Sequence, residues 1–185
     1  MISDEQLVRQ TVSGDVESFN RLVERYHGMV FNLAYRMLGD SSEAEDATQE
    51  SFLEGFKSVK GFQFQSTFKT WLYRVSINTC QQYIRKAESR QRILSSYTEG
   101  VAASQRVDSG PVRPDQHLLK SEREQIVQLA ISDLPPKQRS VVTLFYMEHL
   151  KYREIAEILD CSEGTVASRL NTAISNLKTT LEKRL

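Results

Sequence analysis

Proline is absent from the first 110 residues of this 185-residue chain, and long apolar runs are absent throughout. A proline-free stretch can form continuous helices, because proline removes a backbone donor and breaks a helix interior. No apolar segment approaches the roughly 18 residues that a membrane-spanning helix needs. The first residues, MISDEQ, are polar and acidic and do not resemble a signal peptide. We therefore expect a soluble protein that acts in the cytoplasm.

Cysteine and histidine are scarce, and neither occurs in a pattern typical of a site. Cys80 and Cys161 are far apart in the sequence, which argues against a disulfide framework or a zinc site. His27, His117 and His149 are scattered, with no serine or cysteine constellation of the catalytic kind beside them. No glycine-rich phosphate-binding loop occurs either. The sequence thus indicates no metal site, no cofactor and no catalytic residues.

Net charge is also absent, because 24 Lys and Arg residues balance 24 Asp and Glu residues. This balance excludes a uniformly basic nucleic-acid-binding protein, but it allows separated patches of charge. Residues 1–60 carry 6 basic and 11 acidic side chains, a net charge of −5, whereas residues 61–100 carry 6 and 2, a net charge of +4. An acidic segment is therefore followed directly by a basic one.

Apolar residues recur at three- and four-residue steps through the first 94 residues, which predicts helices rather than strands. We expect four helices. A capping box of Ser3 and Gln6 opens the first, and the second carries apolar residues from Phe19 to Met37 and is closed by Gly39. The third is opened by a capping box of Ser42 and Glu45 and ends near Val59, and the fourth runs from Ser66 or Thr67 to about Leu94.

The composition changes after these helices. Residues 95–114, SSYTEGVAASQRVDSGPVRP, are small, polar and interrupted by glycine and proline, which is typical of a flexible linker. Residues 115–185 are again periodic, with a helix capped by Asp115 that carries Leu118, Leu119, Ile126 and Leu129, and a second helix whose first turn holds Pro135 and Pro136. The predicted fold class is all-α, with two small helical domains, 1–94 and 115–185, joined by that linker.

Residues 151–181 have the pattern of a helix-turn-helix. A short helix from Tyr152 to Leu159 is followed by a tight turn, and Ser162 can cap the next helix. The expected apolar face of that second helix consists of Val166, Leu170, Ala173, Ile174, Leu177 and Leu181, and the polar residues away from it are Thr165, Ser168, Arg169 and Thr172. Such polar groups suit DNA base edges and phosphates. A plain helical hairpin in a core fits the same spacing.

The predicted third helix has an acidic face. Glu43, Glu50 and Glu54 fall on one side with Asp46 beside them, and Phe52, Phe56 and Val59 fall on the other. The acidic face could be simply solvated, a docking surface for a basic partner, or a carboxylate cage for a divalent metal. A cage needs further acids from a second helix, and residues 61–100 supply only Glu88 and Glu99.

Aromatic residues gather beside this helix, interleaved with lysine and arginine. The rings are Phe56, Phe62, Phe64, Phe68, Trp71, Tyr73 and Tyr83. Exposed rings among cations suit unpaired nucleic acid, because bases stack on the rings and cations follow the phosphates. The alternative is that the rings form a core, and we expect Phe56, Trp71 and at least half of the others to be buried. A single-strand site needs only two or three exposed rings, so both interpretations can hold.

Three blocks of this sequence resemble bacterial RNA polymerase sigma factors, most closely the two-domain extracytoplasmic-function (ECF) group of the sigma-70 family. They are FNRLVERYHGMVFNLAYRMLGDSSEAEDATQESFLEGFKSV, FKTWLYRVSINTCQQYIRK and LPPKQRSVVTLFYMEHLKYREIAEILDCSEGTVASRL. The resemblance covers nearly the whole chain except the linker. It implies a specificity subunit that binds core polymerase and directs promoter-specific initiation, in many relatives for a stress or envelope-response regulon, without chemistry of its own.

The resemblance also implies roles for particular residues. Asp46, Gln49, Glu50 and Phe52, with Phe56 beneath, would dock on the clamp helices of the largest polymerase subunit. Phe64, Ser66, Thr67, Phe68, Trp71, Arg74 and Asn78 would capture and open the downstream (−10) promoter element, as duplex and as single strand. Tyr152, Arg153, Glu163, Gly164, Thr165, Ser168, Arg169 and Thr172 would read the upstream (−35) element. An anti-sigma factor, often membrane-anchored, is the usual antagonist.

The recognition helix departs from the family pattern. Many relatives have basic residues at the positions of Ala167, Thr172 and Ile174, whereas here Arg169 is the only cation on that helix before Lys178. Fewer phosphate contacts imply weaker and less salt-dependent DNA binding. We therefore expect negligible DNA binding by the free chain.

Two other functions fit parts of the sequence. A stand-alone helix-turn-helix regulator would bind duplex DNA without polymerase. A metal-dependent helical nucleotide hydrolase would bind Mg²⁺ at Glu43, Asp46, Glu50 and Glu54.

Overall fold

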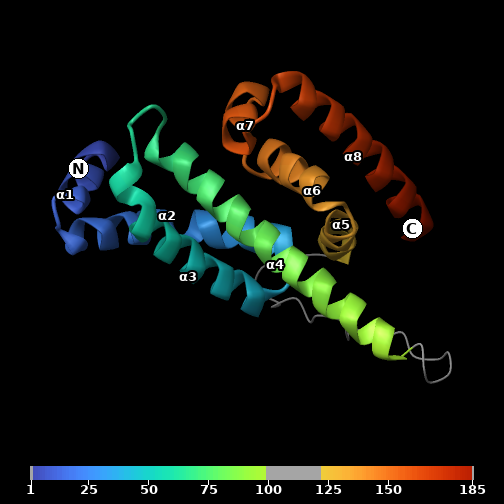
Figure 1. The fold of residues 1–185 in the computed structure, drawn as a ribbon. Helices are drawn as coiled ribbons and strands as arrows, with labels where there is room; N and C mark the ends of the chain where they lie inside the picture. Colours follow the sequence, from blue (N-terminus) through green and yellow to red (C-terminus); the bar gives the residue numbers. More distant parts are fainter. Residues whose placement is uncertain (1, 99–121, 185) are drawn as a thin grey trace.

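The computed structural model describes residues 2–98 and 122–184, whose regular secondary structure is entirely helical (Figure 1). The first domain consists of α1 (Asp4–Val12), α2 (Val16–Leu38), α3 (Ser41–Ser58), the 3₁₀ turn η1 (Val59–Gly61) and α4 (Phe68–Thr98). The second consists of α5 (Glu122–Ser132), α6 (Pro136–Val142), the π-helical turn η2 (Thr143–Met147), α7 (Tyr152–Leu159) and α8 (Glu163–Arg184). The all-α fold class is confirmed. None of these helices is long and apolar enough to cross a membrane.

Most helix ends follow the expected chemistry. Ser3 and Gln6 form the predicted capping box of α1, and Gly39 ends α2 with a φ of 81°, in the left-handed region that favours glycine. The predicted cap of α3 was wrong. Asp40 caps this helix by accepting a hydrogen bond from the Glu43 amide, because the chain re-enters a helix directly after Gly39.

The two ends of α4 compare differently with the sequence. The helix begins close to the predicted position, at Phe68, and the Thr67 hydroxyl before it accepts from the Thr70 amide at 3.0 Å. The helix then continues past Leu94 to Thr98, into the segment expected to be linker. Residues 95–98 contain neither proline nor glycine, so nothing in them stops a helix. The predicted cap Asp115, with Leu118 and Leu119, lies outside the described residues.

The first domain packs around an aromatic and aliphatic core. Its buried members come from α1, α2, α3, η1, the connection after η1, and α4: Leu7, Val8, Phe19, Leu22, Val30, Phe52, Val59, Phe62, Phe68 and Leu72. The short helix α1 is held in place by Leu7 and Val8, which are fully buried. Because α1 contacts both η1 and α4, its outer face lies beside the connection between α3 and α4.

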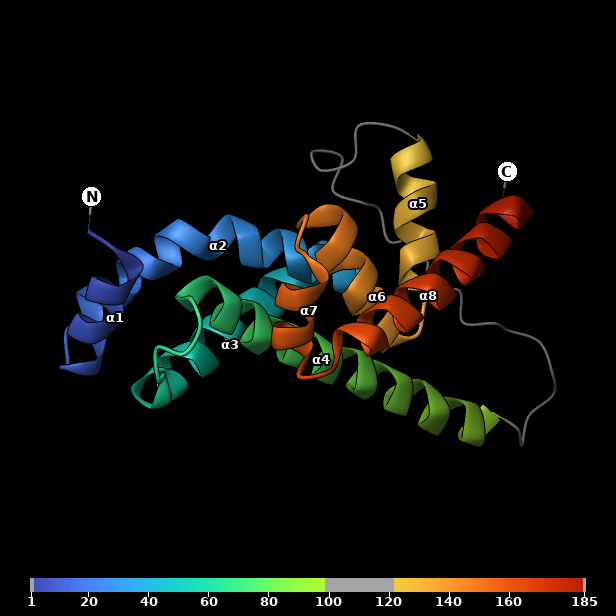
Figure 2. The ribbon, with the colours of Figure 1, turned by 90° about the horizontal axis from the view of Figure 1, so that it is seen from above.

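The two domains lie against each other and share a second apolar cluster (Figure 2). It joins Leu33 and Met37 of α2 and Ile77 of α4 to residues of the second domain such as Ile131 and Ile155. Helices α6 and α7 pack on α4 while α5 and α6 pack on α2. In the structure, the domains are therefore closed on one another.

Polar contacts reinforce this closure. The buried Arg139 guanidinium donates to the Met37 carbonyl across the interface, and also to the carbonyls of Ser132 and Leu134. The Gln128 side chain donates to the Arg36 carbonyl at 3.1 Å.

Two apolar side chains of the second domain are exposed, and one of them, Ile174, was predicted on the apolar face of its helix. Leu129 is 53% exposed and Ile174 is 41% exposed. In α5 the buried face is formed by Gln128, Ala130 and Ile131, because Gln128 reaches carbonyl groups at the end of α2. In α8 the contact face is the narrower stripe that carries Leu170 and Ala173.

Candidate polymerase and nucleic-acid interfaces

The acidic helix α3 presents part of its predicted docking set to solvent. Asp46 and Gln49 are exposed and Glu50 is half-buried. Phe52 is only 6% exposed and belongs to the core of the first domain, so it fixes the helix from beneath. Burial, together with the nearby Asp40 and Asp46 carboxylates, raises the pKa of Glu43. The outer carboxylates therefore stand on a rigidly packed helix.

An apolar groove runs beside these carboxylates, between α2 and α3. It has a volume of about 450 Å³ and is lined by Val16, Phe19, Val23, Phe52, Leu53 and Phe56, with several polar residues. The expectation that Phe56 is buried was wrong, since the ring is 40% exposed and packs edge-on against Phe19. Sequence reasoning missed Val16 and Leu53, which are 56% and 54% exposed. A signal for Leu53 was available, because this residue interrupts the polar side of an amphipathic helix.

The carboxylates do not form the cage that a metal-dependent hydrolase would need. Glu43, Asp46, Glu50 and Glu54 all lie on α3. Within residues 2–98 and 122–184, no three His, Cys, Asp or Glu side chains converge to hold a metal ion. Glu54 instead pairs with Lys57 at 2.6 Å.

The connection between α3 and α4 carries one exposed ring on a set of packed ones. Phe64 is 36% exposed and has a φ of 58°, a left-handed conformation that is rare for a bulky residue. Its ring packs edge-on against Phe62, with 4.9 Å between centroids, and Phe62 packs on Trp71 at 5.5 Å. Phe68 is 3% exposed, so it supports this loop from the core. The structure thus brings Phe64 to the surface and leaves Phe62 and Phe68 as its base.

The other residues expected at the downstream element lie beside this loop and along α4. Ser66 is half-buried and Thr67 is exposed at the start of the helix, followed by the half-buried Trp71. Arg74 and Asn78 are exposed one turn apart. The Arg74 guanidinium donates to the Glu157 carbonyl of α7, so one predicted DNA contact is occupied by the second domain.

Helices α7 and α8 form the predicted helix-turn-helix. Asp160 ends α7 in a left-handed conformation with a φ of 49°, and the Ser162 hydroxyl accepts from the Thr165 amide at 3.1 Å to cap α8. Ile155 of α7 and Val166 of α8 are fully buried. The two helices therefore hold a fixed angle, as reading a DNA groove requires.

The residues expected at the upstream element gather near the start of α8. Glu163, Gly164, Ser168 and Thr172 are exposed, Thr165 and Arg169 are half-buried, and in α7 Tyr152 is half-buried and Arg153 exposed. The Arg169 guanidinium lies 3.8 Å from the Cys161 sulfur in the turn. Arg74, Asn78 and Arg169 line one pocket of about 410 Å³ between the domains. The closed arrangement therefore brings part of each predicted DNA surface, Arg74 with Asn78 and Arg169, into one interdomain pocket.

Comparison with known proteins agrees with this architecture. A family model described as Sigma-70 region 2 matches residues 22–90, and one described as Sigma-70, region 4 matches residues 124–177. The ECF RNA polymerase sigma-E factor of Haemophilus influenzae is 36% identical over 172 residues, covering 91% of this chain and 90% of that protein. The ECF RNA polymerase sigma factor SigW of Bacillus subtilis is 33% identical over 166 residues, covering 89% of each.

Solved structures share the fold at lower identity. CnrH in complex with the cytosolic domain of CnrY superposes with a TM-score of 0.66 at 21% identity, covering 97% of each chain. The sigma factor RpoE of Bartonella quintana in complex with the anti-sigma factor NepR gives a TM-score of 0.64 at 21% identity, covering 90% of this chain and 98% of that one. From these matches over most of its length, together with its two helical domains, the chain belongs to the ECF sigma factors of the sigma-70 family.

Proposed function

We propose that this protein binds core RNA polymerase and directs promoter-specific initiation of transcription as an ECF sigma factor. One observation carries the proposal. This ECF family member has both the exposed Phe64 ring, on a strained loop in its first domain, and a helix-turn-helix, α7 and α8, in its second. The proposal assigns no chemistry to the chain itself, because the polymerase forms the bonds. It assigns the site of action to the cytoplasm, where bacterial polymerase works, and a stress or envelope-response regulon as its target.

The polymerase would dock on α3. Exposed Asp46 and Gln49, with the half-buried Glu50, offer charge and hydrogen bonds to a basic partner, and the adjoining groove offers apolar surface around Leu53 and Phe56. A helical partner such as the clamp helices of the largest subunit fits a groove between two helices. Phe52 would act by holding α3 in place rather than by direct contact.

The two DNA surfaces would act on different parts of the promoter. Phe64 and the start of α4 would receive unpaired bases of the downstream element, and Arg74 and Asn78 would follow the adjoining backbone. Helix α8 would enter the major groove of the upstream element with Thr165, Ser168 and Arg169 toward the bases.

The closed arrangement supports a regulated version of this function. Arg74 and Arg169 line one interdomain pocket, so part of each surface faces the other domain instead of DNA, and we propose that polymerase binding separates the domains. An anti-sigma factor would stabilise the inactive form. A solved sigma factor of this fold, RpoE, was obtained in complex with such a partner, the anti-sigma factor NepR.

The test is a titration of the full chain with bacterial core polymerase. The substitution Asp46→Arg should abolish binding, because it places a positive charge against a basic partner. It should leave the chain folded, because Asp46 is exposed. Glu182→Arg near the end of α8 makes the same charge change at an exposed site away from α3 and should bind normally. Normal affinity of Asp46→Arg would remove the docking assignment.

A gel shift separates this function from the stand-alone regulator. Promoter-length duplex DNA should shift with the chain and polymerase together, and not with the chain alone. A shift by the chain alone, without polymerase binding, would favour the stand-alone regulator.

A further inference from the structure

Helix α1 brings an arginine onto the one exposed ring of the α3–α4 connection. The Arg9 guanidinium lies 4.4 Å from the centroid of the Phe64 ring. Both groups are accessible, since Phe64 is 36% exposed and the Arg9 side chain is 61% exposed. A planar cation therefore occupies the face of the ring on which a nucleic-acid base could stack.

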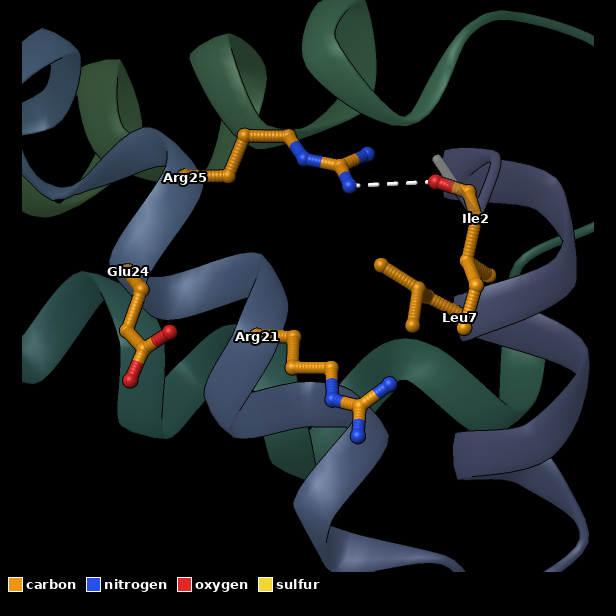
Figure 3. Close-up of a pocket in the computed structure, with 5 residues that line it drawn as sticks. All are labelled: Ile2, Leu7, Arg21, Glu24 and Arg25. Carbon is orange, nitrogen blue, oxygen red and sulfur yellow. Dashed lines mark hydrogen bonds between the residues drawn. The ribbon is translucent and has the colours of Figure 1, made fainter.

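The position of Arg9 is set by the fold and not by the ring alone. Leu7 and Val8 bury α1 against α2. At the chain start, the Arg25 guanidinium donates to the Ile2 carbonyl at 3.1 Å (Figure 3) and also pairs with Asp4. These contacts fix α1 from its start through the turn before Arg9.

A second contact orients the Arg9 side chain. Glu5, one turn earlier, accepts from Nε of Arg9 at 3.2 Å and from Nη2 at 2.7 Å. Both N–H groups donate to the same oxygen, Oε1, which orients the guanidinium while leaving its charge at the surface. Arg9 is therefore presented to Phe64 as an oriented plane.

We propose that Arg9 is a further DNA-contacting residue, forming with Phe64 the two walls of a slot for one unpaired base. The inference rests on the proposed function of this loop. Guanidinium planes and aromatic rings are the two groups that stack on splayed-out bases. A stacked base needs the walls about 7 Å apart, twice the 3.4 Å stacking distance. The flexible arginine side chain can open to that width, and the Phe64 backbone, strained at a φ of 58°, keeps its ring facing the slot.

The experiment uses holoenzyme assembled from the full chain and core polymerase. The probe is a fluorescent DNA duplex with a short mismatched, permanently unpaired segment of random sequence, because base stacking is tolerant of sequence. Arg9→Ala should weaken binding of this probe by about 3- to 10-fold, and Phe64→Ala by at least as much. Arg21→Ala on α2, which removes the same charge outside the slot, should leave binding unchanged.

Arg9→Lys decides between stacking and simple charge attraction. Lysine keeps the charge but lacks the plane, so it should restore less than half of the lost affinity. Full restoration would mean a phosphate contact and would overturn the slot. Tighter binding by Arg9→Ala would mean that Arg9 blocks the ring, and would overturn it as well.

The two proposals fail in distinguishable ways. A loss with Phe64→Ala and none with Arg9→Ala would remove Arg9 and leave the loop assignment intact. No loss with either variant, at normal polymerase affinity, would remove the loop assignment itself.

Discussion

The two surfaces assigned to DNA are built on opposite principles. At the α3–α4 connection, the exposed Phe64 stands on packed rings and carries backbone strain. At the start of α8, small polar residues and one arginine stand on a regular capped helix. The first surface depends on the conformation of a loop, whereas the second depends on side chains exposed on a regular helix. Perturbing the support should therefore damage the first surface far more than the second.

The largest effect should come from Phe62→Ala. This ring is 9% exposed and packs against three other aromatic rings, so its removal should lower the free energy of unfolding by about 3–5 kcal/mol. Ser168→Ala on the exposed face of α8 should change it by less than about 0.5 kcal/mol. Thermal or denaturant unfolding of both variants measures the contrast. Equal stability would show that the loop does not depend on its aromatic base.

A smaller effect should follow from Tyr73→Phe, which tests whether closure covers one surface more than the other. The Tyr73 hydroxyl donates to Glu148 at 2.5 Å across the domain interface. A hydrogen bond to a charged group stabilises a structure by about 1.5–3 kcal/mol. Its loss should raise the open population, which small-angle scattering would detect as an increased radius of gyration. Tyr83→Phe on the same helix is the matched control. Recognition-helix contacts should become more accessible, while Phe64, whose ring contacts come from the first domain, should not change.

The same contact predicts a dependence on pH. Burial, then the hydrogen bond to Glu148, raises the pKa of Tyr73. Its contribution to closure is therefore complete below the ordinary tyrosine value of about 10 and is lost as the pH rises above it. Between pH 8 and about pH 11, the radius of gyration of the wild-type chain should increase in small-angle scattering, and that of Tyr73→Phe should increase less. The same expansion in both would assign the change to other groups.

Arg169→Ala tests the second surface directly. An arginine contact to a base edge contributes about 1–3 kcal/mol of discrimination. The variant holoenzyme should lose protection of the upstream element in a footprint, with polymerase binding and opening of the downstream element unchanged. An unchanged footprint would place the reading residue elsewhere on α8.

The smallest effect should come from Ala167→Arg, which adds the cation that many relatives carry. One added phosphate contact should increase the slope of log affinity against log salt concentration by about one. Ala167→Gln, which adds a longer polar side chain without a charge, controls for the added size. If the slope stays constant, position 167 does not face the backbone.

The sequence predicted the helix-turn-helix better than the aromatic loop, for a physical reason. Helix periodicity and the Ser162 cap depend on neighbours along the chain, so α7 and α8 appeared where expected. Whether a ring is core or surface depends on distant helices. Phe56 was therefore misjudged, and the contact between Arg9 and Phe64 could not be anticipated, because the residues lie far apart in the sequence.

Domain closure was also beyond the sequence in its details. The linker composition indicated two domains, but it gave no sign that Gln128 and Arg139 would reach the carbonyl groups at the end of α2. Backbone acceptors have no signature in a list of residues. The extension of α4 to Thr98 was missed for a simpler reason. Residues 95–98 are compatible with a helix, but they have no apolar periodicity that would predict one.

The shared apolar cluster gives the closed form a temperature dependence. Parting the domains exposes side chains such as Leu33, Ile77 and Ile155 to water, and hydration of apolar surface increases the heat capacity. Hydrophobic association weakens on cooling. A chain that closes through this cluster should therefore be more open in the cold than in the warm, so its readiness to engage polymerase would vary with temperature before any regulator intervenes.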